Sequence, residues 1–152
     1  MHIALYQPDI PQNAGNIIRT GACMAVPVHI IEPAGFDSSD GALKRSGLDY
    51  LQRAEISRHA SFSDFEVWRR GARLRLVALT TKATECHIDF SFSKDDILLL
   101  GRESAGLPDD VHARADARVK IPMASGVRSI NVAAACAMVL GEGLRQTNLF
   151  PS

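Results

Sequence analysis

The sequence predicts an α/β fold in which helices cover both faces of a mostly parallel β-sheet. Strand-like and helix-like stretches alternate along the 152 residues, an order that is typical of such sheets. The predicted strands are short, uninterrupted apolar runs, which is the pattern of parallel strands buried on both faces. No stretch rich in proline, glycine and serine divides the chain, and its length matches one ordinary domain. We therefore expect a single domain over residues 1–152.

The first half of the chain begins with a predicted strand over residues 2–6, followed by a helix that starts at about Pro11. Small and apolar residues recur along this helix at helical spacing, namely Ala14, Ile17, Ile18, Gly21, Ala22 and Ala25. After Pro27 the chain leaves the helix, and residues 28–31 form a second apolar run that predicts a buried strand. A loop is expected over residues 33–41.

The middle of the chain is predicted to hold two more helices and three more strands. A weak, basic helix covers residues 42–51, and a short helix covers residues 62–70 and ends at Gly71. Short apolar runs predict the strands, which cover residues 74–79, 97–100 and 119–121.

The last predicted helix, residues 129–146, carries the clearest packing signal. Between Ser129 and Gly141 its strongly polar side chains are those of Ser129 and Asn131. A helix that is apolar on all sides is buried on all sides. One face therefore covers the sheet, and the opposite face either belongs to the core of a monomer or contacts another chain.

Charge and cysteine content limit the classes of protein to which this chain can belong. The 17 basic and 17 acidic residues cancel, which argues against a protein that coats nucleic acid by bulk charge but leaves room for a local basic patch. The 3 cysteines cannot all pair, and their wide spacing indicates reduced thiols in the cytoplasm. The longest apolar run, residues 132–140, is far shorter than the roughly 20 residues of a membrane span. We expect a soluble, cytoplasmic protein.

The first segment that can carry chemistry is PQNAGNIIRT, residues 11–20, which follows a strand and opens a helix. Asn16, Arg19 and Thr20 share one face of this helix, opposite its apolar side. Because the helix begins near the carboxyl end of a strand, the Arg19 guanidinium can grip a phosphate with two hydrogen bonds. The alternative is a solvated arginine on an amphipathic helix.

The second segment is GRESAGLP, residues 101–108, in which a strand leads into a loop with two glycines. Gly101 lets the backbone approach a ligand closely, and Gly106 permits an unusual backbone conformation. Glu103 either caps the loop or faces a site. The chain has no GxGxxG motif, and Leu-Pro stands where a P-loop requires Lys-Ser/Thr, so the two common phosphate-binding motifs are absent.

The third segment, residues 119–131, leaves a strand and enters the last helix through a loop. Ser129 either caps that helix or faces a site. Asn131 is a polar side chain on an otherwise apolar helix, and a buried amide needs hydrogen-bond partners. The 5 histidines show no HxxxH or HExxH spacing, and no cysteine–histidine quartet suits zinc, so we expect no metal.

Together and in this order, these segments resemble the SPOUT superfamily of RNA methyltransferases. More narrowly, the chain resembles the small tRNA 2′-O-methyltransferases that modify nucleotide 34, the wobble position. The matching stretches are PQNAGNIIR (11–19), HIIEPAGF (29–36), GLDY (47–50), ALTTK (78–82), GRESAGLP (101–108), IPM (121–123) and RSIN (128–131). In the last helix the chain departs from these relatives, because LGEG (140–143) replaces a stretch that usually contains tyrosine.

The resemblance implies a C-terminal trefoil knot, no separate RNA-binding domain, and a homodimer built by the first and last helices. It implies S-adenosylmethionine as the cofactor, with ligand-contacting positions at Leu79, Gly101, Ile121 and Ser129. The residues that it places on the supporting, substrate side of the site are Asn13, Glu103, Gly106 and Asn131. The implied substrate is the anticodon region of tRNA, with C34 or U34 as the target and leucine tRNA as the species.

Arg19 matches the catalytic arginine of this family. Arginine is a poor general base because it stays protonated, so we expect Arg19 to clamp a substrate phosphate and aim the ribose 2′-hydroxyl. A second hypothesis, from another class, is a knotted protein that binds S-adenosylmethionine or a nucleotide and acts through RNA or protein contacts without methyl transfer. Transfer of labelled methyl to bulk tRNA distinguishes the two.

Overall fold

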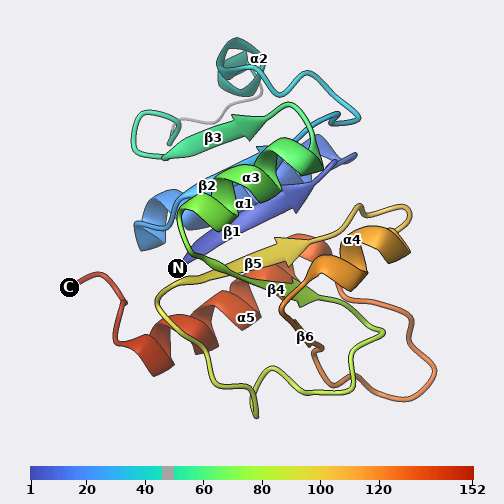
Figure 1. Cartoon of the computed structure of the whole chain (residues 1–152). Coiled ribbons are helices and arrows are strands. Elements are labelled where there is room, and N and C mark those ends of the chain that lie inside the picture. The colour runs from blue at the N-terminus through green and yellow to red at the C-terminus, as the bar shows by residue number, and fades with distance from the viewer. Residues whose placement is uncertain (46–49) are drawn as a thin grey trace.

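The computed structural model describes residues 1–45 and 50–152. Within these residues the chain forms a six-stranded sheet in the order β3-β2-β1-β5-β4-β6, as Figure 1 shows. Every neighbouring pair of strands is parallel, which confirms the predicted sheet. The strands are β1 (His2–Tyr6), β2 (Val28–Ile31), β3 (Ile56–His59), β4 (Arg75–Leu79), β5 (Asp96–Leu100) and β6 (Ala117–Val119).

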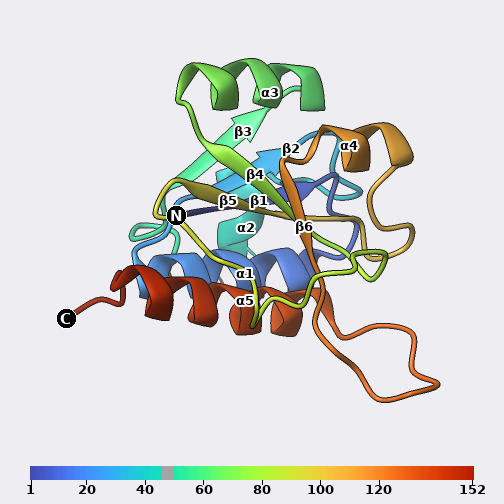
Figure 2. The same cartoon turned by 60° about the horizontal axis from the view of Figure 1, so that its bottom comes forward.

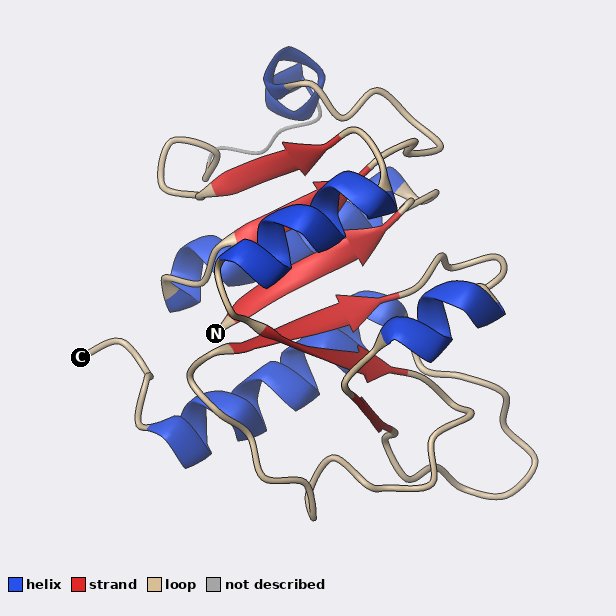
Figure 3. Cartoon of the chain, in the orientation of Figure 1, coloured by secondary structure: helices blue, strands red, loops and turns tan. Residues whose placement is uncertain are grey.

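Helices cover both faces of the sheet, as the sequence predicts. They are α1 (Pro11–Met24), α2 (Asp40–Arg45), α3 (Phe62–Gly71), α4 (Asp109–Arg114) and α5 (Val132–Thr147). In Figure 2, α1 and α5 lie side by side under one face, and α3 and α4 lie over the other. Figure 3 shows the same layers by element type. None of the helices in the described residues combines the length and apolar character needed to cross a membrane.

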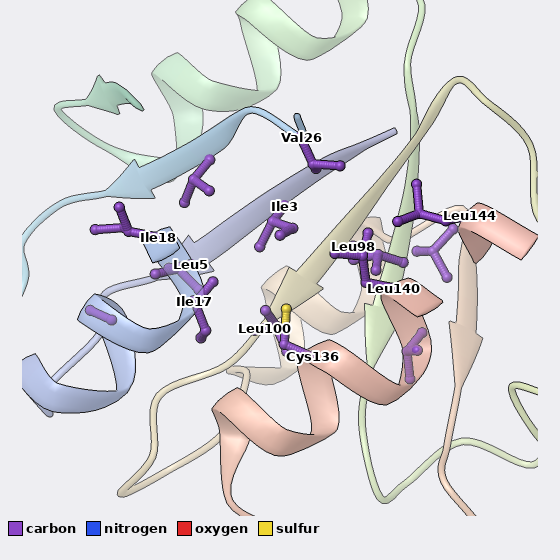
Figure 4. Close-up of a cluster of buried hydrophobic side chains, with 14 of the residues drawn as sticks. Ile3, Leu5, Ile17, Ile18, Val26, Leu98, Leu100, Cys136, Leu140 and Leu144 are labelled. Carbon is purple, nitrogen blue, oxygen red and sulfur yellow. The ribbon is translucent and has the colours of Figure 1, made fainter. Parts of the chain in front are cut away.

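Successive side chains of a strand point to opposite faces of the sheet, so the core consists of two clusters, one on each face. On β1, Ile3 and Leu5 pack toward α1 and α5, whereas Ala4 and Tyr6 belong to the cluster under α3 and α4. Figure 4 shows the first cluster, where side chains of β1 and β5 meet those of α1 and α5. Because the strands are buried on both faces, their side chains read as continuous apolar runs in the sequence.

The sequence does not predict one strand and one helix, because the local sequence pattern of each is weak. β3 is an edge strand whose sequence ISRH contains one apolar residue, and it pairs only with β2 among the described strands. α4 is a six-residue helix in which Val111 is the buried residue. Both depend on tertiary packing more than on a periodic pattern.

Several predicted boundaries differ from the observed ones. The strand predicted at residues 119–121 ends at Val119, because β6 covers Ala117–Val119. The basic helix predicted over residues 42–51 corresponds to α2, Asp40–Arg45 in the described residues, and residues 50 and 51 form a turn. Residues 46–49 of that prediction, with GLD of the GLDY stretch, lie outside the described residues.

The last helix begins later than predicted, at Val132, and its N-cap is Asn131 and not Ser129. The Asn131 side chain accepts hydrogen bonds from the backbone nitrogens of Ala133 and Ala134, at 2.9 and 3.2 Å. Asn131 is exposed, so the expectation of a buried amide is wrong and the capping role accounts for its position.

The chain buries one face of α5 and leaves the other open. Cys136, Val139, Leu140 and Leu144 are buried against the sheet. On the opposite side Ala134 and Ala137 are exposed, and Met138 is 48% exposed. The predicted core helix of a monomer is therefore not observed within this chain. The trefoil knot stays a prediction.

Three histidines on neighbouring strands form a hydrogen-bonded series that the sequence does not reveal. His29 on β2 lies 3.0 Å from a ring nitrogen of His2 on β1 and 3.0 Å from one of His59 on β3. The Trp68 ring covers His29, with the two ring centroids 4.3 Å apart. Burial, followed by the nearby His2 and His59, lowers the pKa of His29 to about 3.

This series predicts that the protein loses stability in acid. The pKa of His29 is lower in the folded chain than in the unfolded chain, where it is ordinary. The unfolded state therefore binds the proton more readily from about pH 6.5 down to about 3. The contribution of His29 is complete above that window and declines by about 1 kcal/mol per pH unit within it. Urea unfolding measured between pH 7.5 and 4.5 checks this.

The matched variants are His29→Phe, which keeps an aromatic ring under Trp68, and His87→Phe at a buried histidine outside the series. His29→Phe should flatten the decline of the unfolding free energy with falling pH, and His87→Phe should retain it. An unchanged decline in His29→Phe would contradict the prediction.

Candidate functional site

A cavity of about 520 Å³ opens where β4 and β5 end, beside the segment that follows β6. Its walls come from the start of α1, the loop after β4, the loop after β5 and the segment that leads into α5. Open α/β sheets bind ligands at the carboxyl ends of their strands, and the volume lies in the range of small-molecule sites. The fold therefore points to this cavity as the binding site.

The cavity brings together eight of the nine site residues expected from the sequence. They are Leu79, Gly101, Ile121 and Ser129, with Asn13, Glu103, Gly106 and Asn131. Motif reading did not single out Ile10, Val132 and Ala135, which also line the cavity. These three are ordinary apolar residues near a helix start, so nothing in their local pattern distinguishes them from core residues.

Gly101 occupies a position where the backbone leaves no room for a side chain. A Cβ built on Gly101 would lie 2.5 Å from the carbonyl carbon of Gly106 and 2.7 Å from the nitrogen of Leu107. The loop closes because Arg102 and Gly106 exchange backbone hydrogen bonds of 3.1 and 2.8 Å. Gly106 itself has a φ of +66°, which favours glycine. Both glycines are needed for the shape of this wall.

Glu103 and Asn13 start a line of polar side chains along the cavity. The Asn13 side-chain nitrogen lies 3.4 Å from Oε1 of Glu103, and the Asn131 side-chain nitrogen donates to Oδ1 of Asn13 at 2.9 Å. Glu103 follows β5, Asn13 belongs to α1, and Asn131 caps α5. Oε2 of Glu103 also accepts a hydrogen bond of 3.0 Å from the backbone nitrogen of Asp9, in the connection before α1, while Glu103 lines the cavity.

Arg19 is the expected site residue that the cavity does not include. It lies on the exposed face of α1, where its guanidinium carbon is 4.5 Å from the centre of the Tyr50 ring. Its Nη2 is 3.5 Å from the Tyr50 hydroxyl. Within one chain, Arg19 is therefore outside the cavity and available to a second molecule.

A pocket at the strand ends of a parallel sheet, closed by a loop that requires glycine, defines the class of α/β proteins that bind a small cofactor. Cofactor-binding α/β proteins include many families, and comparison with known sequences identifies this one. The chain belongs to the SpoU rRNA Methylase family, whose model matches residues 1–141.

Similar proteins support this membership over nearly the whole chain. A tRNA (cytidine(34)-2′-O)-methyltransferase of Ancylobacter novellus is 56% identical over 148 residues, covering 97% of this chain and 94% of the relative. A solved structure described as "Structural insights into the 2-OH methylation of C/U34 on tRNA" is 43% identical with a TM-score of 0.87. The match covers 95% of this chain and 94% of that one.

A more distant structure carries a bound ligand. The SpoU methyltransferase AviRb of Streptomyces viridochromogenes, in complex with the cofactor AdoMet, is 26% identical with a TM-score of 0.85. The match covers 96% of this chain and 60% of AviRb.

Proposed function

We propose that this chain transfers a methyl group from S-adenosylmethionine to the ribose 2′-hydroxyl of nucleotide 34 of tRNA. The observation that carries the proposal is the cavity in which three separate stretches of the family resemblance meet. These are residues 78–82, 101–108 and 128–131, each of which contributes lining residues. The named activity of the relative that is 56% identical supports cytidine 34 as the target.

The cavity fits S-adenosylmethionine in size and in chemistry. Apolar side chains such as Leu79, Leu107 and Ile121 suit the flat face of an adenine, while Gly101 leaves the backbone open to close approach. In this proposal the backbone at Leu79, Gly101 and Ile121 reads the adenine edge, and Ser129 contacts the ligand from the segment before α5. When bound, the cofactor supplies a methyl group on a sulfonium, which is already a good leaving group.

The residues of the chain then have to position the ribose. Arg19 clamps a substrate phosphate and aims the 2′-hydroxyl oxygen at the methyl carbon, since positioning is a large part of the barrier in such a two-component reaction. The ribose oxygen would take the methyl carbon from the bound cofactor, which would leave as the neutral thioether, and the hydroxyl proton would pass to the surrounding water. Glu103, Asn13, Gly106 and Asn131 shape the substrate side of the cavity.

The position of Arg19 outside the cavity favours a homodimer as the active form. α1 and α5 lie side by side (Figure 2), and Arg19 on α1 is exposed, as is the open face of α5. An apolar helix face such as Ala134, Ala137 and Met138 is suited to a second copy of the chain. In the proposed two-fold dimer, both protomers contribute the same surface to the contact, and the site of each protomer is completed near it.

The finer features of the proposal are a cytoplasmic location, leucine tRNA as the substrate and the anticodon region as the part of tRNA that binds. The three free cysteines support a reducing compartment. The cytoplasm is also where tRNA is used in translation.

The proposed function is tested by mapping the methylated nucleotide. Bulk tRNA from cells that lack this protein, incubated with the purified protein and labelled S-adenosylmethionine, should gain a 2′-O-methyl group at nucleotide 34 by mass spectrometry. Cofactor binding without any label in tRNA would instead favour the non-catalytic binding protein. Label at another nucleotide would contradict the assigned target.

The homodimer gives a separate prediction. Ala137→Glu places a charge on the open face of α5 and should produce a monomeric or aggregated protein by light scattering, with methyl transfer lost at the same time. Ala113→Glu, at an exposed alanine of α4, is the matched control and should leave the mass and the activity unchanged. A parent protein with the mass of one chain at micromolar concentration would contradict this prediction.

A further inference from the structure

Asp9 lies just outside the cavity, on the connection between β1 and α1, and it exchanges hydrogen bonds with the loop after β5. Its carboxylate accepts a hydrogen bond of 3.1 Å from the backbone nitrogen of Glu103, and another from the Ser104 hydroxyl. In return, the backbone nitrogen of Asp9 donates to Oε2 of Glu103 at 3.0 Å. Each of the two acidic residues therefore binds the backbone of the other.

The groups around Asp9 keep its side chain ionised. Its contacts with Glu103, and then with the Ser104 hydroxyl, lower the pKa of Asp9. The Arg102 guanidinium lies 3.9 Å from its Oδ2 and adds a positive charge nearby. Asp9 is therefore an ionised acceptor at neutral pH, and hydrogen bonds to a charged acceptor are stronger than those between neutral groups.

We propose that Asp9 is a positioning residue, which fixes the carboxylate of Glu103 at the wall of the cavity for methyl transfer. The loop after β5 is closed at its ends by the backbone bonds between Arg102 and Gly106. In its middle, Glu103 and Ser104 are held by Asp9, from a segment 94 and 95 residues earlier in the chain. Asp9 therefore sets where the loop places Glu103 relative to Asn13. The inference rests on the proposed function and assigns a role to a residue that the family motifs do not single out.

The test is a double-mutant cycle on kcat, measured with saturating S-adenosylmethionine and tRNA. Asp9→Asn keeps the size of the side chain but loses its charge and one acceptor, and should lower kcat roughly 10-fold. In a Glu103→Gln background the same change should cost less than about twofold, because the carboxylate that Asp9 positions is already absent. Asp9→Glu, which retains both acceptor oxygens, should recover most of the loss.

The matched control is Asp37→Asn. Asp37 is an exposed aspartate that also accepts a backbone hydrogen bond, from Ser39 at 3.0 Å, but it lies in the loop before α2. This variant should have the kcat of the parent. A merely structural role for Asp9 predicts the same loss in both backgrounds, together with a lower Tm, and that result would overturn the proposal.

A second measurement needs neither cofactor nor tRNA. Amide hydrogen exchange followed by NMR should show the Glu103 amide exchanging at least ~10-fold faster in Asp9→Ala, while the Gly106 amide stays protected by Arg102. Faster exchange with an unchanged kcat in Asp9→Asn would overturn the positioning role, and unchanged exchange would overturn the contact itself. If the parent transfers no methyl to tRNA, the proposed function fails. The double-mutant cycle is then measured on the affinity for S-adenosylmethionine. Equal losses of affinity in the parent and in the Glu103→Gln background would overturn the inference.

Discussion

Gly101→Val is expected to abolish binding of S-adenosylmethionine while the fold is retained. The atoms that a side chain would meet, in Gly106 and Leu107, belong to the backbone of the same loop, so no flexible side chain can move aside. The loop has to open, and the wall of the cavity moves with it. Because affinity depends on a wall that is already in place, we expect a loss on the order of 100-fold or more by calorimetry.

The structure extends this prediction to the smallest substitution. Even the methyl group of Gly101→Ala would lie 2.5 Å from a backbone carbon, so alanine should also weaken binding. Gly71→Ala is the matched control, because an added Cβ at Gly71 meets nothing within 4 Å and Gly71 ends α3 on the other face of the sheet. A folded Gly101→Val variant with the affinity of the parent would show that the cavity is assigned wrongly.

Arg19→Ala should reduce methyl transfer at least ~100-fold, the range expected when a substrate is no longer positioned. Its affinity for S-adenosylmethionine should stay near that of the parent, because Arg19 lies outside the cavity and contacts Tyr50 instead. Arg19→Lys should also transfer slowly, because an ammonium lacks the planar fork that grips a phosphate with two bonds. Single-turnover kinetics and calorimetry measure the two effects separately.

Arg70→Ala controls for the loss of a positive charge. Arg70 is an exposed arginine of α3 with an ion pair of 3.4 Å to the buried Glu66, and without it Glu66 keeps its shorter ion pair of 2.7 Å with Arg69. The Arg70→Ala variant should transfer methyl at the rate of the parent. A normal rate in Arg19→Ala would refute the role of Arg19, and a large loss of cofactor affinity would place Arg19 at the cofactor.

The sequence by itself determined the parts of this protein that depend on local pattern. The strand at residues 2–6 and the strand at residues 28–31 agree with β1 and β2 to the residue, because buried parallel strands appear as short apolar runs. Gly101 was also identifiable in advance, since a glycine directly after a buried strand marks a close backbone approach. Proline and glycine at the ends of elements provide the same kind of local signal.

Only the tertiary structure decided the contacts that join distant parts of the chain. Gly143 has a low helix propensity when α5 is considered alone, yet in the structure it packs against the Met1 side chain, which an added Cβ would have to displace. His2, His29 and His59 have no metal-ligand spacing, and they meet because β1, β2 and β3 lie next to one another.

The pairing of Asp9 with Glu103 shows the physical reason. β1 lies beside β5 in the sheet, and both strands run in the same direction, so the loops that follow them leave the sheet at the same edge. Helical and strand periodicity specify which face of an element is buried, but they carry no information about which strands become neighbours. The local residues therefore determined the loops and their glycines, and the order of the strands determined that Asp9 holds Glu103.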